Sequence, residues 1–364
     1  MKYEQRNPLP IPASGPSESV SSTMDTIFDW RYALEQENLL GLYEKGKLAT
    51  WNASDLDWSI DVDLEKMMRQ RSGAAAREAF NQLLQPPRPL DDRETVEVNL
   101  NMNAWMLSQF LHGEQGALLA TAKIVQAAPL EEAKWYAANQ VADEARHVEV
   151  YHRYLTEKLG RSFEVNPHLQ TLLDQIIEDS RWDMTYLGMQ IMVEGLALAA
   201  FGLMKVQMPD EPLIQDITSR IMADEARHVA FGVLSLQDLY RDMTEAELRE
   251  REDFIIEATY LMRDRLLMEQ VYERMGFDVK VWVTWATNTP FMKGFRQMLF
   301  SKIVPNLKRL GLLTPRVREA YEKIGILQFE NLKDSTQDAE PTPPAELVQL
   351  LAKLQGAEQA ASDA

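Results

Sequence analysis

Apolar residues recur at helical spacing along most of the chain, and few runs alternate as β-strands would. Gly and Pro stand mainly between the periodic segments. This pattern predicts an all-α protein, with four long central helices joined by short links and therefore folded as an antiparallel bundle. The predicted central helices are 93–127, 130–159, 170–207 and 211–241. Additional helices are predicted towards the two termini, at 24–46, 244–275 and 289–325.

The two ends of the chain have a different composition. Residues 1–22 are rich in Pro and Ser without periodicity, which predicts a disordered N-terminal tail. Residues 331–364 are acidic and predicted to be largely disordered, with one short helix in the stretch AELVQLLAKLQG. Between them, 23–330 is predicted to form a single helical domain around the bundle 93–241.

One stretch inside the third central helix, Leu187–Met204, is apolar except for Gln190 and Glu194. Its length would allow a membrane span. The mid-segment charge and the amphipathic flanks favour a helix buried at the centre of the bundle. That position leaves Glu194 to be explained, because a buried unpaired carboxylate is energetically unfavourable.

Composition narrows the chemistry. The 364 residues contain no cysteine, which excludes disulfides, thiolate metal sites and Cys nucleophiles. Only five histidines are present, so a metal site has to rely on carboxylates. The net charge of −18 argues against a broad nucleic-acid-binding surface. The N-terminus lacks the apolar core of a signal peptide, and a cytoplasmic protein is expected.

The strongest feature is an internal repeat. Residues 142–148 and 223–229 both read Ala-Asp-Glu-Ala-Arg-His-Val. Each copy contains Glu-x-x-His, Glu144 with His147 and Glu225 with His228. Side chains three positions apart share one face of a helix, so each copy offers a carboxylate and an imidazole to one metal ion. A third such pair, Glu149 with His152, has no counterpart in the second copy and is interpreted as a surface pair.

The repeat extends upstream of the heptads. Glu114 precedes Glu144 by 30 residues and Glu194 precedes Glu225 by 31, both within long apolar helices. Four carboxylates and two imidazoles then converge, the pattern of dinuclear carboxylate sites in bundles. Oxygen and nitrogen donors in this ratio suit iron or manganese. The alternative is that these residues form buried ion pairs with Arg146 and Arg227.

The duplicated Asp-Glu-x-Arg-His sequence resembles the ferritin-like superfamily, in particular its di-iron oxygenase and ribonucleotide reductase small-subunit branch. The stretch LYEKGKLATWNASDLDWSIDVD is similar to the N-terminal segment of the reductase small subunit and of the related ligand-binding oxidases. The resemblance covers about 39–63 and 105–235. It implies a ferritin-like four-helix bundle with a dinuclear centre. The metal ligands that it implies are Glu114, Glu144, His147, Glu194, Glu225 and His228.

The resemblance also implies roles for residues beside the ligands. Asp143 and Asp224 would each hydrogen-bond the histidine of the opposite half, and Arg146 and Arg227 would balance those aspartates. The alternative is that all four are solvent-exposed helix charges. Tyr151 occupies the place of the reductase's radical tyrosine, which implies a redox role, although a core tyrosine is the commoner meaning.

Other positions depart from the best-known subtypes of this branch. Trp51 matches the tryptophan of the reductase's electron path, but the first ligand is Glu and not the usual Asp. Ala117 and Met189 stand where the ligand-binding oxidases carry their Val–Tyr cross-link. Leu198 replaces the threonine of the multicomponent monooxygenases. Ile221 replaces the extra histidine of the aryl-amine N-oxygenases. We therefore expect an oxygenase or oxidase that matches none of these subtypes.

Small residues on the two lone-Glu helices predict a cavity for an organic substrate, and apolar neighbours would form its walls. Close helix packing through the small residues is the alternative. The predicted pocket residues are Phe110, Leu111, Ala117, Leu118, Ile191, Leu198, Ala199 and Phe201.

The resulting hypothesis is a non-haem di-iron enzyme that uses O₂ to oxidise a mostly apolar small organic molecule. Two iron ions are expected, with an Mn/Fe pair as the alternative. The chain has no flavin or nicotinamide motif, so a separate ferredoxin or flavin reductase would deliver electrons. A homodimer is expected, with neither a nucleic-acid nor a membrane partner. The alternatives are a radical-generating subunit that depends on Tyr151 and an iron-handling ferroxidase.

Overall fold

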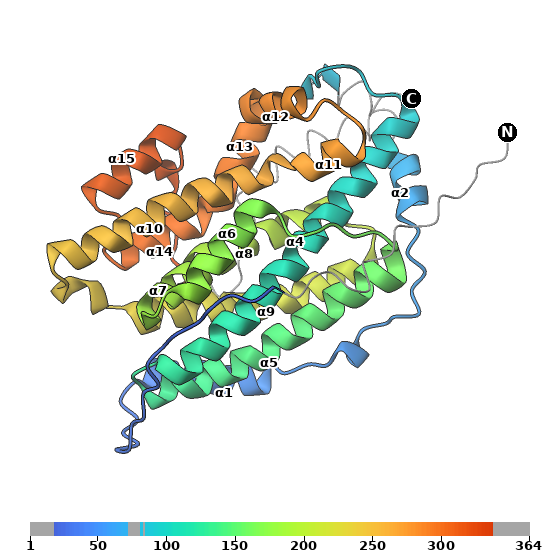
Figure 1. Ribbon diagram of the computed structural model, residues 1–364. Helices are drawn as coiled ribbons and strands as arrows, with labels where there is room; N and C mark the ends of the chain where they lie inside the picture. The colour runs from blue at the N-terminus through green and yellow to red at the C-terminus, as the bar shows by residue number, and fades with distance from the viewer. Residues whose placement is uncertain (1–17, 72–80, 83, 338–364) are drawn as a thin grey trace.

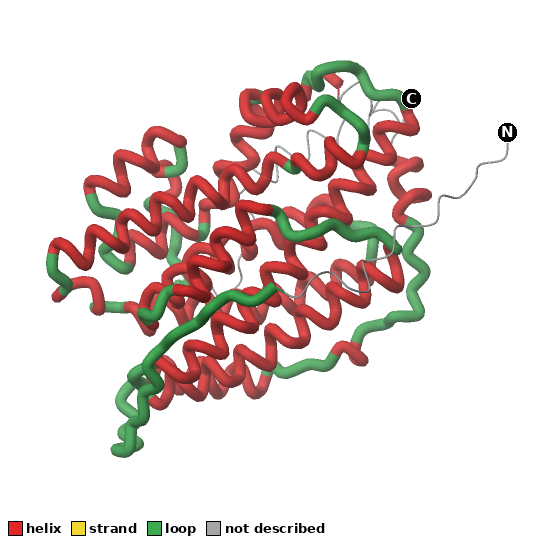
Figure 2. The backbone as a smooth tube through the Cα atoms, viewed as in Figure 1, coloured by secondary structure: helices red, strands yellow, loops and turns green. Residues whose placement is uncertain are grey.

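The computed structural model describes residues 18–71, 81–82 and 84–337, and within them it contains helices and loops but no strand (Figure 2). The predicted all-α fold, with a bundle of long helices at its centre, is confirmed for these residues. Most of the predicted tails, including the AELVQLLAKLQG helix, lies outside the described residues, and the domain limits 23–330 stay a prediction.

The bundle consists of α4 (Asp92–Ala127), α5 (Glu131–Arg153), α8 (Glu194–Gln207) and α9 (Pro212–Leu236). Helix α4 packs along α5, and α8 packs along α9 (Figure 1). Each pair supplies one half of the sequence repeat. The repeat is therefore a repeat of structure, a helix pair used twice.

Local sequence signals start these helices. Asp91 caps α4 by accepting from the backbone N–H of Glu94 at 2.7 Å, and the Glu94 carboxylate accepts from the Asp91 N–H at 3.2 Å. At α9, Glu211 accepts from the N–H groups of Leu213 and Ile214, and Pro212 occupies the first turn, where no N–H is needed. These anchors hold the bundle helices in register.

The predicted single helix 170–207 is wrong. Helix α6 (Pro167–Glu178) ends at Glu178. After a short break the chain continues as α7 (Trp182–Tyr186), a π-helical segment η3 (Leu187–Val193) and then α8. The Asp179 carboxylate accepts from the Arg181 backbone N–H at 2.9 Å, which replaces a helical hydrogen bond. Lys123 donates to the carbonyl oxygens of Ile177 and Asp179 and closes the end of α6.

Three other predicted spans are also shorter or divided. The Glu132 carboxylate takes the N–H groups of Glu35 and Gln36, so the helix predicted from residue 24 starts only at Glu37. The helix predicted to reach residue 275 stops at Asp264, because Met268 adopts a left-handed conformation with φ 57°. The span 289–325 divides into several short helices.

The remaining elements lie before, between and after the bundle helices. They are α1 (Glu37–Leu48), η1 (Ala53–Asp55), α2 (Leu64–Arg71), π-helical η2 (Tyr154–Leu159), η4 (Leu239–Asp242), α10 (Glu245–Asp264), η5 (Arg265–Leu267), α11 (Glu269–Arg274), α12 (Val279–Asn288), α13 (Pro290–Met298), η6 (Leu299–Ser301), α14 (Ile303–Arg309), α15 (Pro315–Ile324) and η7 (Leu327–Phe329).

The apolar stretch around α8 is covered on all sides. Trp182–Gln207 is long and apolar enough to be a candidate membrane span, but 94% of its most apolar window is buried inside the fold. The C-terminal elements provide part of the cover, since η6 packs on α8 and α10 packs on η3. In Figure 1 the C-terminal elements, coloured from golden yellow (α10) to red (α15), form a second layer beside the bundle. The burial agrees with the predicted core helix.

Candidate metal centre

The fold brings all six predicted donors into one buried cluster. Their exposed fractions are 5% or less. Two overlapping groups have mutually close donor atoms: Glu114, Glu144, His147 and Glu225 in one, and Glu144, Glu194 and His228 in the other. The first helix of each half supplies a lone glutamate and the second supplies Glu-x-x-His.

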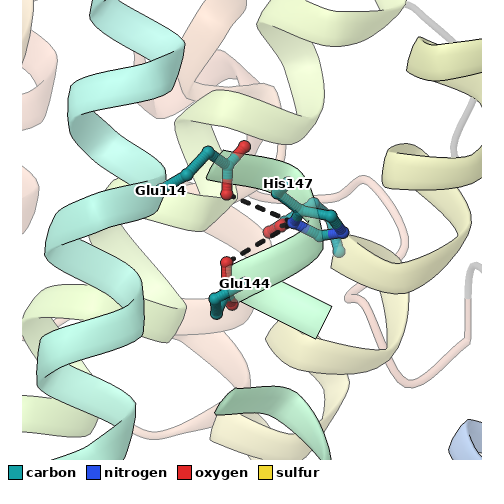
Figure 3. Close-up of side chains that lie close together, drawn as sticks. Glu114, Glu144 and His147 are labelled. Atoms are coloured by element: carbon teal, nitrogen blue, oxygen red, sulfur yellow. Dashed lines mark hydrogen bonds and ion pairs between the residues drawn. The ribbon is translucent and has the colours of Figure 1, made fainter. Parts of the chain in front are cut away.

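At one end of the cluster, three carboxylates surround His147. Its Nδ1 lies 3.3 Å from Glu114 Oε2, 3.4 Å from Glu144 Oε2 and 3.3 Å from Glu225 Oε1. Figure 3 shows Glu114 reaching across from α4 to the two side chains of α5. We call this the Glu114 end.

At the other end, which we call the Glu194 end, His228 takes the corresponding place. Its Nδ1 lies 3.1 Å from Glu144 Oε1 and 3.4 Å from Glu225 Oε1. Glu144 and Glu225 thus approach both imidazoles, whereas Glu114 and Glu194 each belong to one end. Two carboxylates thus lie between the two histidines, and each of the other two lies at one end of the cluster.

Several donor atoms of the cluster have no hydrogen-bond partner among the described residues: Glu144 Oε2, Glu194 Oε2, both carboxylate oxygens of Glu225, and His228 Nδ1. Buried polar atoms normally have a partner, and a bound cation would supply one to these oxygen and nitrogen atoms. Carboxylates and imidazoles are the donors that iron and manganese accept. The residues present therefore fit a dimetal site.

The electrostatics of the cluster are those of concentrated negative charge. Burial raises the pKa of Glu114 and of Glu194 well above the usual glutamate value, and the Glu225 carboxylate adds to both effects. At Glu144 burial acts in the same direction, but the attraction of His228 and His147 is stronger, so the pKa is lowered overall. Cations placed between these carboxylates would relieve their mutual repulsion.

The outer ring nitrogens of the two histidines face aspartates of the opposite half. His147 Nε2 lies 3.1 Å from Asp224 Oδ2, and His228 Nε2 lies 3.2 Å from Asp143 Oδ2. Each aspartate also accepts from an arginine three residues later, Arg146 for Asp143 and Arg227 for Asp224. The structure thus brings together the four residues predicted beside the ligands; their orienting role stays a prediction.

The comparisons with known proteins place this geometry in a family. A family model described as p-aminobenzoate N-oxygenase AurF matches residues 117–311, more than half of the chain. The chain belongs to the AurF family. The matched region contains five of the six donors, and Glu114 lies just before it. The expectation that the chain matches none of the best-known subtypes was therefore wrong at the level of the family.

Solved structures with a similar chain trace include a mutant R2-like ligand-binding oxidase with an Mn/Fe cofactor. It is 17% identical, with 75% of this chain and 93% of that chain covered and a TM-score of 0.46. The dimanganese(II)-NrdF of Streptococcus sanguinis is 14% identical, with 81% and 98% covered and a TM-score of 0.47. No curated protein matches the sequence significantly.

This AurF-family chain has no histidine at the position where the sequence comparison expected one for an N-oxygenase. Ile221 is fully buried there, one turn before Glu225 on α9. The absence of that histidine is what misdirected the subtype prediction. For assigning the family, the duplicated heptad is more informative than the residue at this one position.

Sequence reasoning missed one polar side chain of the cluster altogether. Gln140 Nε2 donates to Glu144 Oε1 at 2.9 Å and to Glu194 Oε1 at 3.0 Å, and it joins the two halves at the Glu194 end. Gln140 is one turn before Glu144 on α5. Its spacing from the heptad was therefore a usable signal, since residues four apart share a helix face.

Two further contacts distinguish the paired aspartates. Trp51, 5% exposed, donates from Nε1 to Asp224 Oδ2 at 2.8 Å, and the guanidinium groups of Arg146 and Arg220 lie over its ring. On Asp143 the corresponding partner is Asn139, whose Nδ2 lies 3.3 Å from Oδ2. Trp51 had been noted only by resemblance, and its hydrogen bond gives it a physical connection to His147.

Tyr151 is fully buried one turn beyond His147. Its ring centroid lies 5.8 Å from that of Phe110 and 6.2 Å from that of Phe201. Its hydroxyl has no hydrogen-bond partner in the described part of the chain, and burial raises its pKa well above the usual tyrosine value. By contrast Glu149 and His152 are exposed, as the interpretation of a surface pair requires.

The predicted pocket residues divide into two groups. Leu111 and Leu118 are half-buried, and six are buried core residues: Phe110, Ala117, Ile191, Leu198, Ala199 and Phe201. The small residues beside them serve packing at two positions: Gly116 faces Leu173, and a Cβ on Gly195 would lie 3.1 Å from Ile303. At these glycines close helix packing, the alternative interpretation, applies. The pocket itself stays a prediction.

Proposed function

We propose that this protein is an O₂-dependent dimetal oxygenase that acts on the amine of a small, mostly apolar organic molecule. The observation that carries the proposal is the match to an N-oxygenase family over a region that contains five of the six clustered donors. It goes beyond the broader conclusion, an oxygenase or oxidase of the di-iron type, by naming the reacting group.

Glu114 and His147 would hold one metal ion, Glu194 and His228 the other, and Glu144 and Glu225 would be shared. Two iron ions are proposed, with Mn/Fe as the alternative. When bound, the metal pair would supply the capacity to reduce O₂. The protein's own contribution is burial, which excludes bulk water from all six donors, together with the orientation of the imidazoles.

That orientation follows from the aspartates. An Nε2–H of His147 that donates to Asp224, and one of His228 that donates to Asp143, would leave each Nδ1 unprotonated and facing the cluster. Each histidine is then held in the tautomer that a metal requires. Because each aspartate comes from the other half, the two halves have to pack together correctly before either histidine is held in this tautomer.

Electrons would come from a separate ferredoxin or flavin reductase. The chain of hydrogen bonds from Trp51 through Asp224 to His147, at 2.8 and 3.1 Å, supports entry beside η1. A cytoplasmic location and a homodimer remain part of the proposal.

A direct test is turnover of 4-aminobenzoate by the iron-loaded protein with a chemical reductant and O₂. We expect an N-oxygenated product that incorporates oxygen from ¹⁸O₂, and its loss in Glu225→Ala. A product that carries no label, or uptake of iron far beyond two ions per chain, would exclude an oxygenase.

One observation favours a second candidate, a radical-generating oxidase. Tyr151 is shielded from water by Phe110 and Phe201 one turn beyond His147. In that case the oxidised protein should show a stable paramagnetic tyrosyl signal that disappears in Tyr151→Phe. For the oxygenase we expect little stable signal.

A further inference from the structure

The repeat assigns to each residue of the first half a counterpart in the second. Glu114 and Glu194 are 80 residues apart, and Glu144 and Glu225 are 81 apart. The same offsets relate the residues one or two turns from the donors. The two ends of the cluster can therefore be compared position by position.

Around the Glu114 end these positions are apolar or aromatic. The ring centroids of Phe110 and Phe201 are 4.6 Å apart, and Tyr151 packs against both. Ile221 lies one turn before Glu225 and is fully buried. At these four positions the only polar group is the Tyr151 hydroxyl.

Around the Glu194 end every counterpart is small or polar. Gln190 replaces Phe110, Thr121 replaces Phe201, Gly232 replaces Tyr151 and Gln140 replaces Ile221. The same contacts recur: Gln190 Nε2 lies 3.5 Å from Thr121 Oγ1, and a Cβ on Gly232 would lie 2.5 Å from Gln190 Cβ. Gly232 thus makes room for Gln190, which stands in the π-helical segment η3, one turn before Glu194.

Two carbonyl oxygens at this end are buried acceptors without a donor within the described residues, Gln140 Oε1 and Gln190 Oε1. The orientation of the Gln140 amide follows from its contacts, because Nε2 donates to two carboxylates. Both side chains are fully buried. An unsatisfied buried acceptor is unfavourable, and two of them next to a proposed metal ligand indicate a missing donor.

We propose that Gln140 and Gln190 accept the N–H groups of the substrate's primary amine and thereby determine specificity for amines. The inference rests on the proposed function and extends it to particular residues. A primary aromatic amine has two N–H donors for two acceptors: Gln140 contacts the proposed metal ligand Glu194, and Gln190 precedes Glu194 by one turn. An analogue with a methyl group in place of the amine would leave both acceptors unsatisfied.

The test compares binding of 4-aminobenzoate and of 4-methylbenzoate to the metal-loaded full chain by calorimetric titration. A site built around hydrogen bonds discriminates against the analogue that lacks the donor, and we expect about tenfold tighter binding of the amine. Gln190→Met, which keeps the side-chain length, should reduce this ratio to about two, with the affinity for 4-methylbenzoate and the metal content unchanged. Gln190→Glu, which retains acceptor oxygens, should preserve the preference.

The matched control is Phe110→Leu, at the position that corresponds to Gln190 in the first half. This variant should weaken the binding of 4-aminobenzoate and of 4-methylbenzoate to a similar extent. Equal binding of the two ligands by the unmodified protein, or an unchanged ratio in Gln190→Met, would overturn the inference even if the amine is oxygenated. If the ratio depends on Gln190 but no oxygenated product forms, the proposed function fails and the amine site stands.

Discussion

The Glu114 end and the Glu194 end of the cluster have the same donors but different surroundings. At the Glu114 end, His147 contacts an aspartate that also holds Trp51, and an aromatic group packs one turn away. At the Glu194 end, His228 contacts an aspartate beside Asn139, and Gln190 and Thr121 stand at the positions of Phe110 and Phe201. Duplication accounts for the similar donors at the two ends, whereas the neighbouring residues make the surroundings of the two ends different.

Part of that difference comes from segments outside the repeat. Trp51 belongs to the chain before the first bundle helix, and Ile303, which faces Gly195, belongs to the C-terminal layer. A pair of similar halves therefore becomes asymmetric without a change in the clustered carboxylates and imidazoles. This suggests that the ends can be tested separately.

The largest effect should come from a shared donor. Glu225 approaches both histidines, so Glu225→Ala should lower the metal content from two ions per chain to less than one. Glu194→Ala, at one end only, should leave about one ion, because His147 keeps its three carboxylates. Metal analysis of the purified variants measures both. Equal losses would mean that Glu225 is not shared.

An intermediate effect is expected at the aspartates. Asp224→Asn and Asp143→Asn should each weaken metal binding by roughly ten- to a hundredfold, because the amide no longer holds the histidine tautomer as the carboxylate does. The controls Glu149→Gln and His152→Gln change exposed residues and should have almost no effect. If the controls weaken metal binding to the same degree, the ligand face has been assigned wrongly.

The smallest effect is expected on stability, when the side chains that hydrogen-bond Asp224 and Asp143 are removed one at a time. Trp51→Phe removes a buried 2.8 Å hydrogen bond and should lower the free energy of unfolding by about 1 to 2 kcal/mol. Asn139→Ala removes a 3.3 Å contact and should lower it by less than about 1 kcal/mol. Denaturant unfolding of the metal-free protein measures both. Equal losses, or a larger loss in Asn139→Ala, would show that the Trp51 hydrogen bond does not make the Glu114 end the more firmly anchored one.

The sequence predicted that these six side chains would come together, because they obey two simple rules, spacing along a helix and duplication; their role as metal ligands stays a prediction. The six residues converge because Glu-x-x-His lies on one face and the bundle pairs the halves. Gln140 was missed although it obeys the first rule, because an amide is not an expected metal donor. Gln190 and Thr121 become informative only when their counterparts are known to be in contact.

The fold was predicted less completely where tertiary contacts decide local structure. Lys123 reaches from α4 to end α6, and Glu132 reaches from α5 to the backbone before α1. Neither contact can be read from the periodicity of the helix that it limits. The helices α2 and α12 were not predicted at all, and both lie outside the repeat.

The π-helical segment η3 sets the rotation of α7 relative to α8. A π-helical turn holds an extra residue compared with an α-helical turn, and one residue corresponds to about 100° of rotation about an α-helix. Removal of one residue from 187–193 would therefore let the segment relax to α-helix and rotate Tyr186 and everything before it relative to Glu194. The glutamate could keep its place only if α7 were turned out of its packing against the bundle. A single-residue deletion here would act on the orientation of a whole helix, and its effect would extend far beyond the residue removed.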